Sequence, residues 1–182
     1  DTGVLSATTA FGKTVVAAWL VARRGTNALV LLHRQQLLEQ WVERLSQFLG
    51  LPPKEIGRWG GGKKKLTGRI DVALMQSLVR KNVVNDLVAN YGHLIVDECH
   101  HLSAHSFELV ARRAKAKFVT GLSATVARKD GHQPIIFMQC GPVRHRVDAR
   151  LQAMERPFTH EVLVRPTGFM PGGEPDQDQR ME

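Results

Sequence analysis

Short apolar stretches alternate with amphipathic stretches along most of the chain. The apolar stretches predict strands at residues 3–7, 28–32, 71–75, 93–97 and 118–123. Between them, apolar positions recur at helical spacing, which predicts helices that include residues 15–20 and 35–49, with further helical stretches around 85–89 and 106–115. This alternation predicts an α/β fold of three layers, in which a mainly parallel central sheet is covered by helices on both faces.

Two segments depart from this pattern. Between residues 58 and 81, seven Lys and Arg residues outnumber the one acidic residue, Asp71. This segment, which includes Lys63, Lys64 and Lys65, is expected to form an exposed basic loop or hairpin. After residue 141 the alternation weakens. We therefore expect one α/β domain over residues 1–150, an extra strand (158–165) or the start of a linker within 151–167, and a flexible polar tail over 168–182.

The composition narrows the class of protein. The 182 residues are 43% hydrophobic and 23% charged, which supports an ordinary core and excludes disorder for most of the chain. A net charge of +8 favours a polyanionic partner such as nucleic acid. The two cysteines, Cys99 and Cys140, form no disulfide framework. With no apolar run near the roughly 20 residues that span a bilayer and no recognisable signal peptide, we expect a cytoplasmic protein without a membrane role.

Residues 7–14, Ala-Thr-Thr-Ala-Phe-Gly-Lys-Thr, lie between a predicted strand and a predicted helix. A phosphate-binding loop requires this context, because its backbone N–H groups and the positive end of the following helix converge on a phosphate. Lys13 would reach the β- and γ-phosphate oxygens of ATP, and Thr14 would ligate Mg²⁺. The candidate nucleotide-binding residues are Thr9, Ala10, Phe11, Gly12, Lys13 and Thr14. The loop departs from the usual glycines at Ala7 and Ala10.

A second group of candidate residues follows the apolar stretch at 93–96. Strand ends of a parallel sheet meet neighbouring loops at one edge, so Asp97 could hold Mg²⁺ through water while Glu98 orients or deprotonates a water for phosphoryl transfer. His100 could sense the nucleotide and touch a second element. After the stretch at 118–123, two hydroxyls in Ser123-Ala124-Thr125 could hydrogen-bond to these acidic residues.

The same region offers a different interpretation, a zinc site. Cysteine and histidine residues are clustered there, and His33 could approach them. The candidate ligands are Cys99, His100, His101, His105 and His33. Adjacent His100 and His101 point different ways and no second cysteine pair exists, so Mg²⁺ with ATP is the preferred interpretation.

Residues 7–14, 97–100 and 123–125 together resemble motifs I, II and III of superfamily 2 helicases. The segments 33–41, 76–78 and 121–131 resemble the group that contains XPB-type repair helicases and type III restriction Res subunits. The resemblance implies a RecA-like P-loop NTPase domain, the first of two in that family, and places His33 and Arg34 in motif Ia and Gln76 and Ser77 in motif Ic, which line the nucleic-acid path. Motifs IV to VI and the upstream adenine-recognising segment are not found, so we expect this chain to be one half of a motor.

The expected function is therefore the ATP-binding half of a DNA helicase or translocase, with DNA preferred to RNA as partner. Lys63, Lys64 and Lys65 are expected to bind nucleic-acid phosphates. The side chain of Trp59 could either stack on a base of the nucleic acid or anchor the hairpin by packing against the sheet. The first alternative is a small P-loop kinase. The residues that resemble motifs II and III disfavour it, because such a kinase would not require them. A nucleotide-gated nucleic-acid-binding module without efficient hydrolysis stays open as the alternative.

Overall fold

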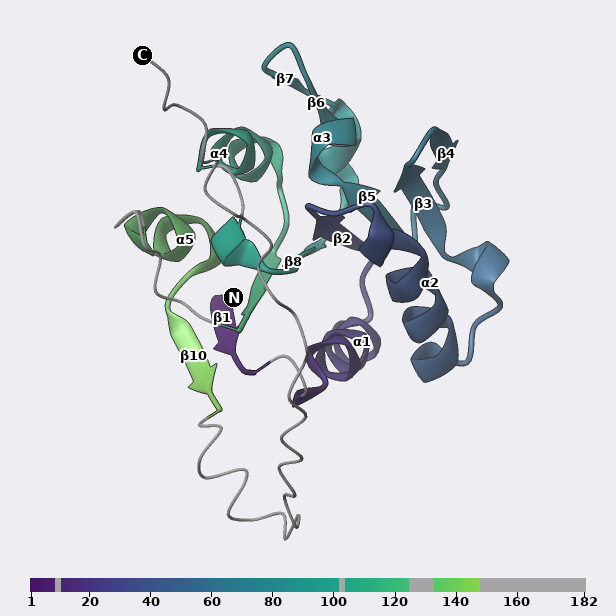
Figure 1. The fold of residues 1–182 in the computed structure, drawn as a ribbon, viewed down its shortest axis with the longest axis horizontal. Helices are drawn as coiled ribbons and strands as arrows, with labels where there is room; N and C mark the ends of the chain where they lie inside the picture. Colours follow the sequence, from purple (N-terminus) through teal and green to yellow (C-terminus); the bar gives the residue numbers. More distant parts are fainter. Residues whose placement is uncertain (9–10, 102–103, 125–132, 148–182) are drawn as a thin grey trace, which may run out of the picture.

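The computed structural model describes residues 1–8, 11–101, 104–124 and 133–147. Within these residues, one eight-stranded sheet forms the centre of the molecule (Figure 1). Its strands in spatial order are β10 (Val143–Arg146), β1 (Thr2–Ser6), β9 (Phe118–Ser123), β8 (His93–Val96), β2 (Ala28–Leu32), β5 (Ile70–Leu74), β3 (Gly57–Gly60) and β4 (Lys63–Lys65). Neighbouring strands are parallel except β3 and β4, which form an antiparallel hairpin. A separate two-stranded hairpin pairs β6 (Val79–Arg80) with β7 (Val83–Val84).

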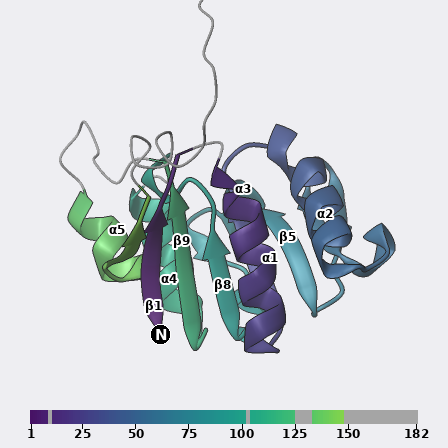
Figure 2. The same cartoon turned by 90° about the horizontal axis from the view of Figure 1, so that it is seen from below.

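Helices cover both faces of the sheet, which confirms the predicted three-layer α/β fold. Helices α1 (Lys13–Arg24) and α2 (Gln36–Leu49) pack on one face. The short α3 (Met75–Leu78), together with α4 (Ala104–Arg113) and α5 (Gln133–Cys140), packs on the other. Figure 2 shows α1 and α4 on opposite sides of β8 and β9. Three short 3₁₀ segments complete the described chain: Pro53–Glu55, Asp86–Asn90 and Cys99–His101.

The central strands divide their side chains between two cores. All five residues of β2 are buried, because helices cover the sheet on both sides. Leu29 and Leu31 join the core beneath α4 and α5, whereas Val30 and Leu32 join the core beneath α1 and α2. This division follows from the two-residue period of a strand, in which successive side chains point to opposite faces. The carboxyl ends of β1, β8 and β9 are thereby held at one edge of a rigid sheet.

The sequence predictions of the elements need several corrections. Met75 begins a helix instead of ending a strand, and the helix expected around residues 85–89 is a 3₁₀ segment. On α1, Val15 and Trp19 are 47% and 59% exposed, because the small residues of this helix pack against the sheet instead. Strand β10 and helix α5 were not predicted; β10 pairs at the sheet edge with largely exposed polar side chains, so it carries no apolar alternation. The strand expected at 158–165 and the tail at 168–182 lie outside the described residues.

No helix in the described part of the chain is both long enough and apolar enough to cross a membrane.

Candidate functional site

The loop between β1 and α1 leads directly into the first helix. The backbone N–H of Ala7 donates to the carbonyl oxygen of Ser123 at 2.9 Å, which ties the start of the loop to the end of β9. Gly12 has φ of +91°, a left-handed conformation that glycine adopts without the steric cost of a Cβ, and α1 begins at the next residue. Thr9 and Ala10 lie outside the described residues. The N-terminal end of α1, with its positive dipole end, therefore lies at the carboxyl edge of the sheet.

Lys13 contacts one of the two acidic residues that follow β8. Its Nζ donates to Oε1 of Glu98 at 2.7 Å, and the two side chains are only 8% and 21% exposed. Glu98 itself has φ of +46°, unusual for a residue with a side chain. Such conformations cost about 1–3 kcal/mol and are concentrated at functional sites. The two segments that resemble motifs I and II thus meet through an ion pair.

Asp97 is the most buried carboxylate of this site, with 7% of its surface exposed. Its Oδ2 accepts a hydrogen bond from Nε1 of Trp41 at 2.9 Å, and its Oδ1 accepts one from the backbone N–H of Glu98 at 3.0 Å. Burial raises the pKa of the Asp97 carboxyl, and the negative charge of Glu98 acts in the same direction; the Trp41 hydrogen bond and the charge of Lys13 oppose this rise. The helical spacing of apolar positions over 35–49 predicts a buried face that includes Trp41, but it does not reveal this contact.

His100 connects the acidic residues with the end of β9. Its Nδ1 lies 2.7 Å from Oγ of Ser123 and 3.3 Å from Oε2 of Glu98. Ser123 therefore meets the segment that resembles motif II at His100, where the sequence analysis expected a contact with the acidic residues. Ala124 follows and is partly buried, and Thr125 lies outside the described residues.

Residues from three segments line one cleft of about 440 Å³ at this edge of the sheet. They are Gly12, Lys13, Thr14, Leu37, Gln40, Trp41, Arg44, Asp97 and Glu98. Phe11 does not line this cleft, although the sequence analysis grouped it with the nucleotide-binding residues. It lines a larger apolar hollow of about 590 Å³ between α1 and the strands β1 and β10, as do Val4 and Leu20. That hollow lacks Lys13 and both site carboxylates, so we assign the chemistry to the smaller cleft.

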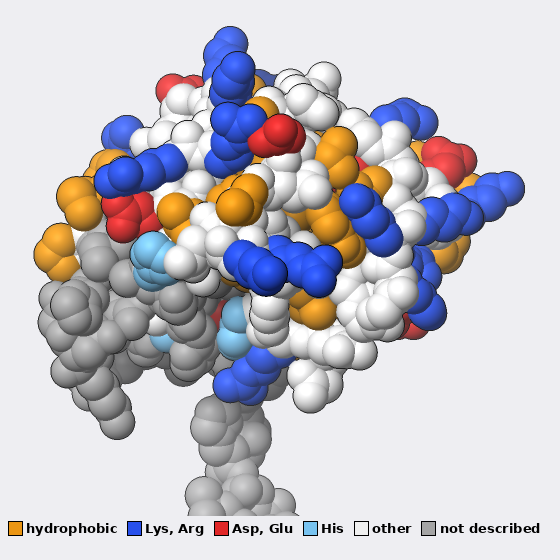
Figure 3. Space-filling view, turned by 90° about the horizontal axis from the view of Figure 1, so that it is seen from above, with side chains coloured by type: hydrophobic (Ala, Val, Ile, Leu, Met, Phe, Trp, Pro, Cys, Tyr) orange, Lys and Arg blue, Asp and Glu red, His pale blue; other side chains and the backbone are white. Residues whose placement is uncertain are grey.

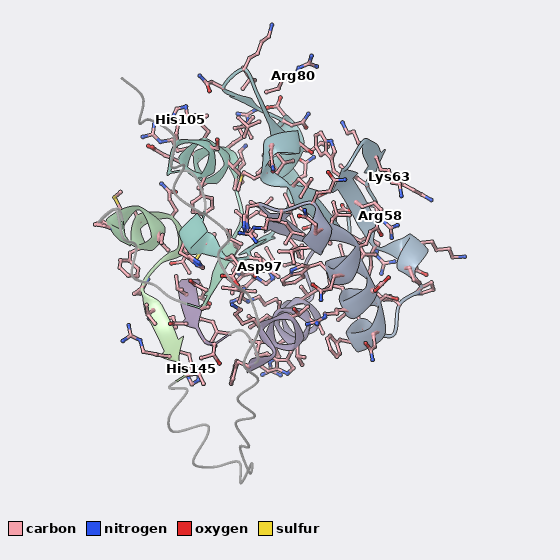
Figure 4. The ribbon with its side chains drawn as sticks, in the orientation of Figure 1. Arg58, Lys63, Arg80, Asp97, His105 and His145 are labelled. Atoms are coloured by element: carbon pink, nitrogen blue, oxygen red, sulfur yellow. The ribbon has the colours of Figure 1, made fainter. Side chains whose placement is uncertain are left out.

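The ligand atoms of the cleft suit magnesium better than zinc. Thr14, Asp97 and Glu98 offer hydroxyl and carboxylate oxygens, which are the donors that Mg²⁺ prefers. Among the described residues, no three His, Cys, Asp or Glu side chains come together in a metal-ligand cluster. Figure 4 shows His105 on α4, well away from Asp97. Cys99 and Cys140 are both buried and hydrogen-bond to each other. This hydrogen bond and burial raise the pKa of the Cys140 thiol.

The candidate nucleic-acid residues lie in two places. Near the site, the amide Nε2 of Gln76 donates to the backbone oxygen of His33 at 3.2 Å, because β2 and β5 are neighbours in the sheet. Arg34 and Gln76 are exposed, and Ser77 is partly exposed. Farther out, Lys63, Lys64 and Lys65 form the exposed edge strand β4, which confirms the expected basic hairpin.

Contacts around the hairpin hold it in place. Arg58 and Lys63 lie 3.2 and 3.9 Å from the carboxylate of Glu39 on α2. Trp59 is partly buried against the core, and Nζ of Lys64 lies 4.1 Å from the centre of its ring. Figure 4 shows Arg58 and Lys63 together on one side and Arg80 at the tip of the β6–β7 hairpin. In Figure 3, Lys and Arg side chains are spread over much of the described surface of that face.

The fold, the family match of residues 1–128 and the helicase relatives together define the N-terminal RecA-like P-loop domain of a superfamily 2 helicase. Residues 1–128 match the family described as type III restriction enzyme, res subunit. The chain belongs to this family, which agrees with the resemblance to the XPB and Res group.

Similar proteins include viral and bacterial helicases. The chain is 34% identical over 133 residues to a probable helicase, D10, of Escherichia phage T5, covering 73% of this chain and 28% of that protein. It is 31% identical over 140 residues to the DNA 3'-5' helicase XPB of Mycobacterium tuberculosis, covering 74% of this chain and 25% of that protein. The chain thus spans only about a quarter of these relatives.

Solved structures confirm the fold. The UvsW helicase of bacteriophage T4 superposes with a TM-score of 0.67 at 19% identity, covering 79% of this chain and 54% of that chain. The Hef helicase domain of Pyrococcus furiosus superposes with a TM-score of 0.65 at 22% identity, covering 80% and 34%.

Proposed function

We propose that this chain is the ATP-binding domain of a nucleic-acid-dependent ATPase that couples hydrolysis to movement on DNA. The observation that carries the proposal is the ion pair between Lys13 and Glu98, which lies in one cleft with Thr14 and Asp97. A buried lysine, a hydroxyl and paired carboxylates at the carboxyl edge of a parallel sheet are the groups that phosphoryl transfer from ATP requires. The helicase names of the relatives support the same activity.

In this proposal the loop and the first turn of α1 bind the phosphates of ATP. Lys13 exchanges its carboxylate partner for β- and γ-phosphate oxygens. Thr14 and Asp97 would hold Mg²⁺, Asp97 through water, and the metal would supply positive charge against the phosphate oxygens. Residues 9–12 supply backbone N–H groups.

Glu98 becomes available for the chemical step once Lys13 turns to the phosphates. Its carboxylate orients the attacking water and accepts a proton as the water oxygen bonds to the γ-phosphorus and the bond to the β-phosphate oxygen breaks. His100 contacts both Glu98 and Ser123, so it is placed to report the state of the nucleotide to the end of β9.

Nucleic acid would cross the carboxyl ends of β2 and β5, where His33, Arg34, Gln76 and Ser77 lie, and reach Lys63, Lys64 and Lys65 on β4. The relatives titled DNA helicases favour DNA, although a mimivirus relative is titled an RNA helicase. A second RecA-like domain in a longer protein would supply an arginine finger, which contributes about 10³ to 10⁵ in rate.

The test has two stages. Calorimetry on the 182-residue chain should show Mg·ADP binding that Lys13→Ala removes. Steady-state ATPase assays on a longer protein with both RecA-like domains, with and without duplex DNA, should then show DNA-stimulated turnover. Nucleotide and DNA binding without turnover would support the nucleotide-gated binding module instead. Absence of nucleotide binding would overturn both.

A further inference from the structure

Trp41 is a buried aromatic residue with one polar atom, the indole nitrogen. It lies in the middle of α2 and is 3% exposed. Its neighbours on the buried face of the helix, Leu38 and Leu45, are aliphatic and pack in the same core. In this apolar environment the indole N–H donates a hydrogen bond to Oδ2 of Asp97, which is 2.9 Å away and 56 positions along the chain.

Packing of α2 against the sheet does not by itself require the hydrogen bond between Trp41 and Asp97. A smaller aromatic residue, phenylalanine, would fill most of this space without bringing a hydrogen-bond donor into the core, and a buried donor that lacks an acceptor costs about 1–3 kcal/mol. The acceptor is the carboxylate that the proposed function assigns to Mg²⁺. Each Asp97 oxygen accepts one hydrogen bond, Oδ1 from the backbone of Glu98 and Oδ2 from Trp41, so each keeps a further lone pair for water.

We infer that Trp41 is the positioning residue of the metal site: its indole N–H fixes the Asp97 carboxylate, and Mg²⁺-dependent nucleotide binding depends on that hydrogen bond. The inference rests on the proposed function, since it assigns Asp97 to the metal. Groups that hydrogen-bond to metal-binding carboxylates fix their orientation, and loss of such a group costs about 10- to 100-fold in metal affinity.

The position of Trp41 also makes α2 part of the nucleotide site. Helix α2 begins at Gln36, two residues after Arg34. The carbonyl of His33 is held by Gln76, another candidate nucleic-acid residue. Any shift of α2 that nucleic acid imposes at this end would therefore move the indole that holds Asp97. The helix joins the predicted nucleic-acid path to the metal carboxylate through a single hydrogen bond.

Calorimetry on the 182-residue chain tests the inference. For each variant, ADP affinity is measured with Mg²⁺ and with a chelator, and the ratio of the two affinities is the metal gain. Trp41→Phe should lower the metal gain about tenfold while metal-free ADP affinity stays within about twofold, because Lys13 and the loop are untouched. Leu45→Ala loosens the same face of α2 without touching the carboxylate, and Trp19→Phe removes an exposed indole on α1; both should keep the wild-type metal gain.

A second measurement does not depend on whether Trp41→Phe folds. The chain has three tryptophans, so its amide NMR spectrum should contain three indole N–H signals. Adding Mg²⁺ to the ADP complex should shift the signal of Trp41 and leave those of Trp19 and Trp59 in place. A stationary Trp41 signal, an unchanged metal gain in Trp41→Phe, or an equal loss in Leu45→Ala would overturn the inference. If the wild-type chain binds ADP neither with nor without Mg²⁺, the proposed function itself fails.

Discussion

Nζ of Lys13 and Oε1 of Glu98 lie 2.7 Å apart although 85 positions separate the two residues in the chain. The contact joins the N-terminus of α1 to the segment after β8, two strands away in the sheet. In the proposed function, the phosphates of a nucleotide compete with Glu98 for the ammonium group of Lys13. The first two predictions follow from this competition.

Removing the amine should abolish most nucleotide binding. Lys13→Ala deletes charge-assisted hydrogen bonds to phosphate, each worth about 1.5–3 kcal/mol, so Mg·ADP affinity should fall by about 10- to 100-fold or more. Lys54→Ala, which changes an exposed lysine in a 3₁₀ segment, is the matched control and should bind as the wild type does. Calorimetry on the 182-residue chain gives the answer. Equal affinities in the wild type and Lys13→Ala would contradict the assignment of the cleft.

Neutralising the competing carboxylate should have the opposite effect on binding. Glu98→Gln removes the negative charge that holds Lys13, so Mg·ADP affinity should stay the same or rise by up to about tenfold. In a longer protein with both RecA-like domains, the same change should reduce ATP turnover by about 10²- to 10⁴-fold, because no group accepts the proton of the attacking water. Turnover close to that of the wild type would show that Glu98 is not the water-orienting residue.

The basic edge strand should contribute a salt-dependent part of DNA binding. Changing Lys63, Lys64 and Lys65 together to alanine should flatten the slope of log affinity against log salt by about 0.9 for each duplex DNA phosphate that these lysines neutralise in the wild type. A control triple variant on α4 and the turn after it, Arg112, Arg113 and Lys115 to alanine, removes as much charge from another element. Fluorescence anisotropy at several salt concentrations measures both. If the two variants change the slope alike, the effect is one of net charge.

Acid should destabilise the chain partly through His93. Burial, together with the charge of nearby Arg24, lowers the pKa of His93 to about 3, far below its ordinary value of 6.5. The folded state therefore excludes a proton that the unfolded state binds, and stability falls as pH drops below 6.5, by up to about 1.4 kcal/mol per pH unit. His93→Gln should lose this part of the slope. Urea unfolding between about pH 6.5 and pH 4.5 compares the two slopes, and parallel slopes would refute the assignment.

Much of the fold follows from local pattern. The five apolar residues Ala28–Leu32 predicted a strand buried on both faces, and the loop at 7–14 is continuous in sequence, so its place before a helix was predictable. The order of the motifs, from Lys13 to Asp97 to Ser123, was enough to suggest the family. In each case the physical information lies within a few neighbouring residues.

The tertiary structure decided which surfaces meet. Helical spacing indicated that Trp41 is buried, but only the packing of α2 on the sheet gives its N–H an acceptor in Asp97. The same limit applies to Phe11, which belongs to the phosphate loop in sequence and packs beside an apolar hollow in space, and to Trp19, which has helical spacing yet is 59% exposed. Strand β10 has no apolar alternation, so only its pairing with β1 identifies it as a strand. A periodic pattern of apolar residues indicates that a side chain is buried. Which residue that side chain contacts depends on the packing of segments that lie far apart in the chain.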